Sequence, residues 1–175
     1  MIRNIAATLT FFFATIVFGA TASAQLSDVL KETHGDWEIR CINDSNTCAM
    51  SQVGKTNDGK RALLVTIQRL KGAAAENGTV VPAAMTVQTP LGILLPYGVR
   101  LKIDADQVIP LPLSRCVPAG CVSQAPMLDQ AVAKMKKGSK AVFGFFLESE
   151  VLVNVSLRGF TKAFNSLTPV AQQQR

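Results

Sequence analysis

The chain has 175 residues, of which 18 are Lys or Arg, 12 are Asp or Glu, one is His and 48% are apolar. This length allows one domain with a substantial core, and no low-complexity tract or internal repeat indicates a second one. The cations are scattered and aromatic residues make up 6%. This argues against a nucleic-acid-binding protein, because those proteins cluster cations and aromatic side chains.

The first 24 residues predict a cleavable export signal. Arg3 supplies the positive charge, and the run from Ile5 to Gly19 is apolar apart from three threonines. A small-x-small site ends at Ala24 and places cleavage before Gln25. The apolar run is roughly 15 residues long, shorter than the ~20 that span a bilayer. We therefore expect an exported mature chain without a transmembrane segment.

Four cysteines follow this signal as two close couples, Cys41 with Cys48 and Cys116 with Cys121. An even set of cysteines in an exported chain predicts disulfides, and four cysteines allow three pairings. Polar turn residues at 43–46, and Pro and Gly within 117–120, favour pairing inside each couple.

Strand patterns dominate the first two thirds of the mature chain. In 36–41 apolar residues alternate with charged ones, so Trp37, Ile39 and Cys41 share a face, and residues 47–53 pair back on this strand. The nearly continuous apolar run 62–67 predicts a strand covered on both faces.

Further strands are predicted later in the chain. Residues 80–89 form a weaker strand, and 99–103 alternate with Val, Leu and Ile facing inward. Pro110 and Pro112 remove backbone donors from one edge of the strand 109–113, which predicts an edge position for that strand.

The last part of the chain predicts two helices around a hairpin. Pro126 is expected in the first turn of a helix that ends at Gly138, with a buried stripe that includes Leu128, Val132 and Met135. Residues 142–147 and 151–157 predict two strands joined at 148–150, and a short helix at 160–167 follows.

Together these elements predict one mainly β domain, residues 25–175 with a core at about 35–167. The expected architecture is an antiparallel β-sandwich or partly open barrel with two short helices and two local disulfides.

No catalytic, metal-binding or cofactor-binding set emerges from the residue pattern. His34 lies in a segment expected to be mobile, and the cysteine spacings differ from those of zinc sites and redox motifs. Trp37 is more typical of a core residue than of a ligand platform. We therefore expect a protein that is not an enzyme.

Two alternatives remain open. Carboxylates occur in pairs at Asp104 with Asp106 and at Glu148 with Glu150, both in predicted turns, so an enzyme with a carboxylate site is the first alternative. A carrier of a small apolar ligand, closed by the apolar segment 91–97, is the second.

The one cluster of cations comprises Lys134, Lys136, Lys137 and Lys140. Lysines at the end of a helix complement its dipole, and this is the favoured interpretation. The alternative is a weak contact with anionic lipid or lipopolysaccharide.

Five blocks in this order carry a family resemblance: GDWEIRC at 35–41, CAMSQ at 48–52, LLPYGV at 94–99, RCVPAGC at 115–121 and SLRGF at 156–160. Together they resemble the invasion-associated locus B family of Gram-negative bacteria. The resemblance implies a periplasmic or envelope-associated binding or structural protein with a role in host-cell interaction. Its partner would be an unknown envelope protein or surface component. No catalytic residues carry over, and the cysteines are the functional set that maps residue by residue.

Overall fold

The computed structural model describes residues 28–42, 47–72, 74 and 78–171. The predicted signal and its cleavage site between Ala24 and Gln25 lie outside the described residues. None of the helices in the described ranges is long and apolar enough to cross a membrane.

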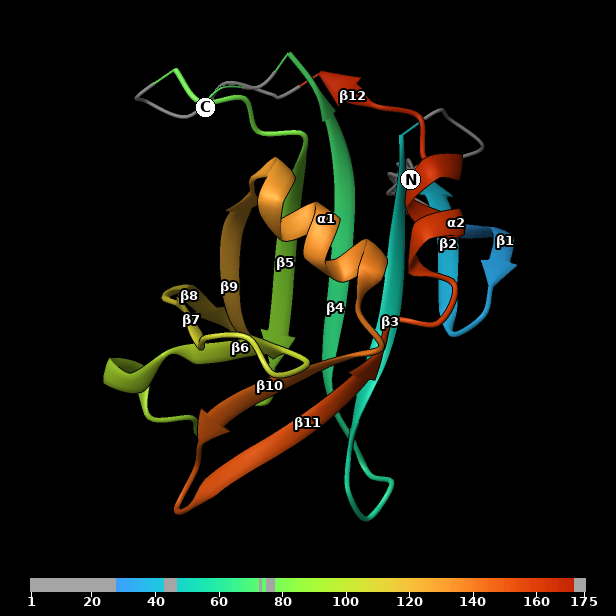
Figure 1. The fold of residues 1–175 in the computed structure, drawn as a ribbon. Coiled ribbons are helices and arrows are strands. Elements are labelled where there is room, and N and C mark those ends of the chain that lie inside the picture. Colours follow the sequence, from blue (N-terminus) through green and yellow to red (C-terminus); the bar gives the residue numbers. More distant parts are fainter. Residues whose placement is uncertain (1–27, 43–46, 73, 75–77, 172–175) are drawn as a thin grey trace, which may run out of the picture.

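The described chain is built mainly of strands, with two α-helices and one 3-10 turn (Figure 1). The strands are β1 (Asp28–His34), β2 (Trp37–Ile42), β3 (Cys48–Thr56), β4 (Arg61–Lys71), β5 (Ala83–Thr89), β6 (Val99–Ile103), β7 (Ile109–Leu111), β8 (Leu113–Val117), β9 (Gly120–Met127), β10 (Lys140–Phe146), β11 (Glu150–Ser156) and β12 (Val170–Ala171). The helical segments are η1 (Leu95–Tyr97), α1 (Asp129–Lys137) and α2 (Phe160–Ser166).

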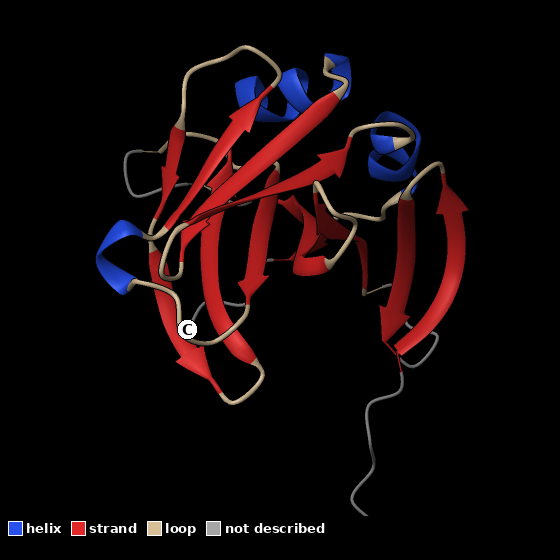
Figure 2. Cartoon of the chain, turned by 90° about the horizontal axis from the view of Figure 1, so that it is seen from below, coloured by secondary structure: helices blue, strands red, loops and turns tan. Residues whose placement is uncertain are grey.

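The main sheet is antiparallel and runs in the order β7-β6-β10-β11-β3-β4-β5-β9-β8. Its first and last strands, β7 and β8, are consecutive in the chain and meet at Pro112, so the sheet curves into a nearly closed barrel. The Ser123 hydroxyl donates to the Pro112 carbonyl at 2.8 Å across this junction. Figure 2 shows the strands curving around the interior. The predicted mainly β fold is therefore confirmed in its barrel form.

The interior of the barrel is filled by the inward side chains of these strands. The largest fully buried side chains include Trp37, Phe143, Phe145 and Phe160. The rings of Trp37 and Phe160 meet edge to face, with centroids 5.3 Å apart, which couples α2 to β2. The predicted alternation of β2 is confirmed, because its odd-numbered residues are buried.

Two sequence expectations about the region before α1 were wrong. Pro126 lies in β9 opposite Ala84, and the helix begins at Asp129. The neighbouring strand β8 pairs with β9 only as far as Ser123, so a proline further along β9 removes no ladder donor. Leu128 is 42% exposed because it precedes the helix in extended conformation, whereas Val132 and Met135 are buried as predicted.

Two other expectations fail for reasons of sheet geometry. His34, expected in a mobile segment, ends β1 and pairs in register with Trp37. Strand β4 is buried on one face through Leu63, Val65 and Ile67, but its other face is half-buried. The closed sheet explains this difference, because one face lines the interior and the other is outer surface. The predicted edge position of the Pro110 strand is confirmed, since β7 ends the sheet path, but the predicted strand 109–113 stops at Leu111 and Pro112 lies between β7 and β8.

Candidate functional site

One edge of β3 is shared by two different strands. Strand β2 pairs with the first part of β3, from Cys48 to Ser51, and β11 pairs with Lys55 and Thr56. Gln52 lies in β3 between the two paired stretches, at the point where the sheet forks. This residue is buried, with 8% of its surface exposed.

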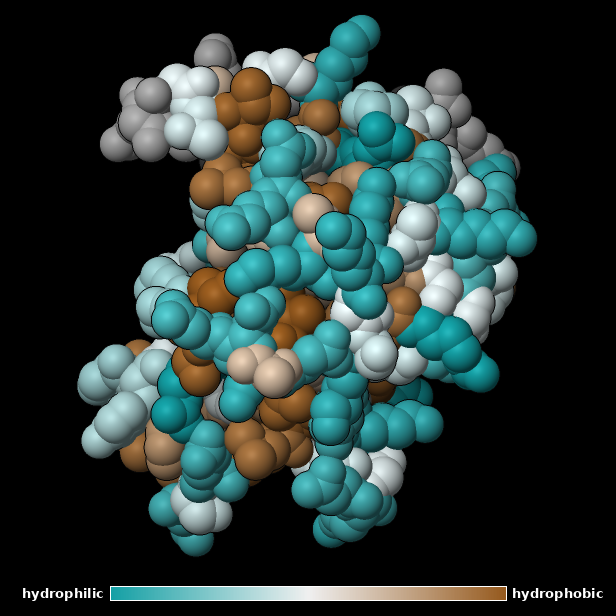
Figure 3. Space-filling model, in the orientation of Figure 1, coloured by the Kyte–Doolittle hydropathy of each residue, from teal (hydrophilic) through white to brown (hydrophobic). Residues whose placement is uncertain are grey.

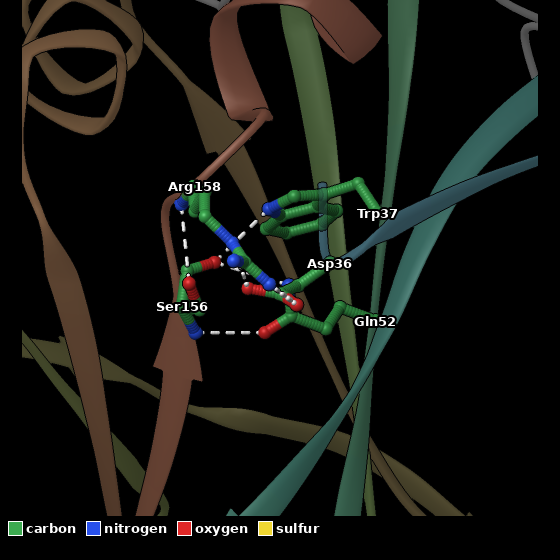
Figure 4. Close-up of polar contacts among 5 residues, drawn as sticks. All are labelled: Asp36, Trp37, Gln52, Ser156 and Arg158. Carbon is green, nitrogen blue, oxygen red and sulfur yellow. Dashed lines mark hydrogen bonds and ion pairs between the residues drawn. The ribbon is translucent and has the colours of Figure 1, made fainter. Parts of the chain in front are cut away.

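The Gln52 side-chain amide takes the place of a peptide group at this fork (Figure 4). Its Nε2 donates to the carbonyl oxygen of Ser156 at 3.0 Å, and its Oε1 accepts from the Ser156 backbone N–H at 2.7 Å. Trp37 Nε1 donates to the same carbonyl at 3.0 Å. These bonds satisfy the Ser156 backbone on the side facing β3, where β11 is no longer paired, while Lys140 of β10 is its register partner on the other side.

An ion pair between Arg158 and Asp36 makes a second contact at the fork. The Arg158 guanidinium holds Asp36 through two bonds, Nε to Oδ2 at 3.2 Å and NH2 to Oδ1 at 2.7 Å. This bidentate contact, followed by a hydrogen bond from Ser156, holds the pKa of Asp36 below its ordinary value of 3.8. The chains also approach closely here, because a Cβ on Gly159 would lie 2.0 Å from the His34 carbonyl oxygen.

The five residues Asp36, Trp37, Gln52, Ser156 and Arg158, which we call the fork cluster, form a structural joint. The Ser156 hydroxyl accepts from the Arg158 backbone N–H at 3.1 Å, and Asp36 is held as an ionised ion-pair partner. Neither group has the arrangement of an activated nucleophile with its base. Within the described chain, no buried side-chain nitrogen or oxygen lacks a hydrogen-bond partner.

An exposed apolar loop connects β5 to β6. We define the apolar loop as residues 91–97, in which Leu91, Leu94, Leu95 and Tyr97 are 45–61% exposed. Ile93 is buried and anchors the loop, and Leu94 N donates to the Phe146 carbonyl at 2.8 Å.

The apolar loop is also held by its aromatic side chain. The Tyr97 ring packs on the Phe146 ring, with centroids 4.9 Å apart. The Arg100 guanidinium lies over the same Phe146 ring, 4.9 Å from its centroid. Figure 3 shows apolar side chains at the surface over the part of the fold where β10 and β11 lie. The loop therefore presents apolar side chains to the outside on a fixed backbone.

A groove on the outer face of the barrel is the third candidate. It is an open depression of about 1290 Å³ over β2, β3 and β4, with the end of β11 at its margin. Strand residues such as Ser51, Leu64 and Thr66 line it. We call it the outer groove.

The predicted carboxylates are placed in separate local contacts. Asp104 accepts from the backbone N–H groups of Ser139 and Lys140 at 3.0–3.3 Å, which fixes the connection from α1 to β10. Asp106 pairs with Lys134 at 3.1 Å, and Glu150 pairs with Arg100.

The lysine cluster lies at the end of α1. Lys134, Lys136 and Lys137 occupy the last helical turn, as the dipole interpretation predicts. Lys136 donates to Asn165 at 2.9 Å and lies 4.8 Å from the Phe164 ring centroid, so it links α1 to α2. Lys137 and Lys140 are exposed.

The predicted disulfides are present and local. Cys41 is bonded to Cys48, and Cys116 is bonded to Cys121. In each disulfide the two cysteines are also directly opposite one another on paired strands. Among the described residues, no group of three His, Cys, Asp or Glu side chains is arranged to hold a metal ion.

Sequence reasoning missed the fork cluster as a unit. The blocks GDWEIRC and SLRGF contain four of its members, and the structure places these two blocks side by side through the contact of Asp36 with Arg158. Gln52 ends the CAMSQ block, but no pattern marked its side chain as buried, since glutamine is ordinarily exposed on a strand.

The fold and its two hairpin disulfides define a disulfide-braced, nearly closed antiparallel barrel. The model of the invasion-associated locus B (IalB) family matches residues 37–168. The chain belongs to the IalB family. Two disulfides and this membership indicate a protein that functions outside the cytoplasm.

Individual relatives are similar over most of their length. An invasion protein B homologue of Brucella abortus is 26% identical over 170 residues, which covers 94% of this chain and 93% of the relative. Invasion protein B of Bartonella bacilliformis is 30% identical over 146 residues, covering 79% and 75%. The crystal structure of invasion-associated protein B from Bartonella henselae matches with a TM-score of 0.62 and 26% identity, over 79% of this chain and 96% of that one.

Proposed function

We propose that the chain is a non-enzymatic binding protein of the periplasm or cell envelope, and that it docks another envelope protein through the apolar loop. The observation that carries this proposal is the set of four large apolar side chains, Leu91, Leu94, Leu95 and Tyr97, each about half exposed on one short segment. Clustered exposed apolar side chains are typical of interaction sites, whereas single ones are ordinary.

Three contacts within the chain support the backbone of the loop. Buried Ile93, the bond from Leu94 to β10 and the packing of Tyr97 on Phe146 hold the loop in place. A site that is already ordered loses little conformational entropy on binding, so more of its apolar burial contributes to affinity.

The charge near the loop favours a protein partner over an anionic membrane. The Leu147 side chain lies near Gly92, so the hairpin that carries Glu148 and Glu150 adjoins the loop. Glu150 is paired with Arg100, so the carboxylate of Glu148 is the one at this position that repels an anionic lipid surface and suits a partner with a cationic rim. Two relatives are named as invasion proteins, which supports the proposal that this docking contributes to contact with host cells.

The test is site-specific photo-crosslinking in living cells of the source bacterium. A photoreactive residue at Leu95 is compared with one at Lys102, which is exposed on β6. We expect one defined envelope protein to crosslink at Leu95 and not at Lys102, and Leu94→Asp to abolish that product.

The same product at both positions, or no product at Leu95 in any growth condition, would contradict docking through the loop. Far-UV circular dichroism of the Leu94→Asp variant establishes that the loss does not come from unfolding.

A further inference from the structure

The outer groove has a chemical character that differs from an ordinary solvated sheet face. The central residues of β4 that line it, Leu64, Thr66 and Gln68, are uncharged, and the charged Arg61 lies at the start of the strand. Ser51 of β3 faces Thr66 in register, so hydroxyl and amide groups converge on the floor between short apolar side chains. Solvated faces of strands usually alternate charged residues with buried ones.

One end of the outer groove concentrates positive charge. Lys55 of β3 lies directly opposite Arg61 of β4, and both line the groove. Like charges at opposed strand positions repel each other. Within the described ranges neither cation makes an ion pair, and the carboxylate of Asp36, on which Lys55 acts at longer range, is already held by Arg158.

At the other end of the outer groove, carboxylates outnumber cations. Arg40 contacts Glu38 at 3.0 Å and Asp28 at 3.9 Å, so its charge is fully engaged and this end keeps an excess of carboxylate. The groove thus combines an uncharged hydrogen-bonding floor with one cationic end, where Lys55 and Arg61 make no ion pair among the described residues, and one end where carboxylates are in excess.

We propose that the outer groove binds an acidic oligosaccharide. Its anionic group would lie between Lys55 and Arg61, and its hydroxyl groups would exchange hydrogen bonds with Ser51, Thr66 and Gln68. Charge-assisted hydrogen bonds to an anion are stronger than neutral ones, which makes the cationic end the anchor.

Two features favour a sugar over a peptide, and an acidic sugar over a neutral one. The backbone groups of β3 and β4 are used in their ladder, so an extended peptide finds only side chains on this face and would pair better with a free strand edge. No aromatic side chain is among the residues that line the groove, so stacking on a neutral sugar ring is not available.

This proposal concerns a different surface from the apolar loop and does not depend on the docking proposed above. Residues 91–97 are absent from the lining of the outer groove. Either proposal can therefore fail alone.

The test is isothermal titration of the oxidised, purified mature chain with defined oligomers. Tetragalacturonate and a sulfated heparin tetrasaccharide are the acidic sugars, maltotetraose is the neutral sugar, and tetraglutamate is the acidic peptide. The groove variant is Lys55→Glu/Arg61→Glu. The control with the same change in net charge is Lys102→Glu/Lys162→Glu, at two exposed sites outside the groove.

We expect saturable binding of at least one acidic sugar, weakened about tenfold or more in the groove variant and little changed in the control. Thr66→Val tests the floor without changing charge, and we expect it to weaken the same sugar. Maltotetraose and tetraglutamate should bind distinctly more weakly.

Three results would overturn the proposal. These are no binding of either acidic sugar, equal weakening in the two charge-reversed variants, and binding of tetraglutamate as tight as that of the sugar. Circular dichroism of each variant confirms that the fold is retained.

Discussion

Replacing Gln52 with leucine should destabilise the protein far more than the same replacement at an exposed position. The change keeps the approximate size of the side chain but removes both bonds to Ser156. The Ser156 carbonyl keeps its bond from Trp37, whereas its N–H loses its partner at a part-buried site. An unsatisfied buried donor costs about 1–3 kcal/mol and a lost hydrogen bond about 1 kcal/mol.

Burial of the apolar leucine recovers part of this cost. The exchange of an amide for a methyl-bearing group at a buried site is worth roughly 1 kcal/mol. The expected net loss in the free energy of unfolding is therefore about 2 kcal/mol. For a protein of this size the urea dependence is about 2 kcal/mol/M, so the unfolding midpoint should fall by roughly 1 M.

The assay is equilibrium urea unfolding of the oxidised protein, followed by far-UV circular dichroism. Trp37 is the only tryptophan and a member of the fork cluster, so its fluorescence serves as a second, local probe. Gln124→Leu on β9 is the matched control, since Gln124 is exposed. Its expected effect is within about 0.5 kcal/mol. If Gln52→Leu falls within that same margin, the amide does not act as a peptide substitute at the fork and the account of the joint is wrong.

Three further predictions concern other parts of the same framework. Gly159→Ala should cost at least about 3 kcal/mol, or prevent folding, because the new Cβ meets a backbone carbonyl at 2.0 Å, whereas Gly59→Ala, at a similar positive φ but in open space, should cost about 1 kcal/mol by thermal unfolding. Asp36→Asn should lose about 0.5–1 kcal/mol at neutral pH, and the difference from the wild type in acid titrations should shrink as the pH falls below 3.8 and through the lowered pKa of Asp36, because a lowered pKa stabilises only while the carboxylate is ionised; a difference that does not shrink in acid would contradict the ion pair as its source. Replacing Cys41 and Cys48 by alanine should lower the unfolding free energy by about 2–2.5 kcal/mol, as closing so short a loop predicts, and urea unfolding of a cooperative, folded variant would distinguish this from a fold that requires the bridge.

Local patterns in the sequence were sufficient for the elements whose burial alternates. The strand β2 was predicted with its buried face, and the hairpin disulfides followed from turn residues between close cysteines. These features depend on neighbours a few residues apart, so the sequence carries them directly.

Strand β1 could not be found in the same way. All its residues but His34 are exposed, because it pairs with β2 alone and covers no core. A strand without a buried face leaves no alternation in the sequence. Pro126 shows a different limit, since proline suits both the first turn of a helix and an unpaired strand edge, and only the extent of β8 decides between them.

The fork cluster was beyond sequence reasoning because its contacts are long-range. Gln52 and Ser156 are 104 residues apart, and Trp37 and Ser156 are 119 apart. The choice of β2 and β11 as joint neighbours of β3 depends on the closure of the whole barrel. Side chains that act only after such closure carry no local periodicity.

The closure itself has a consequence for how this scaffold can vary. The two strands at the seam are separated in the chain by Pro112 alone, so the cylinder is completed without a long connection. Insertions between other strands lengthen a rim loop, which folded proteins tolerate readily. An insertion between β7 and β8 would instead separate the two edge strands of the sheet and open the barrel. We therefore expect related barrels to vary least in length at this junction.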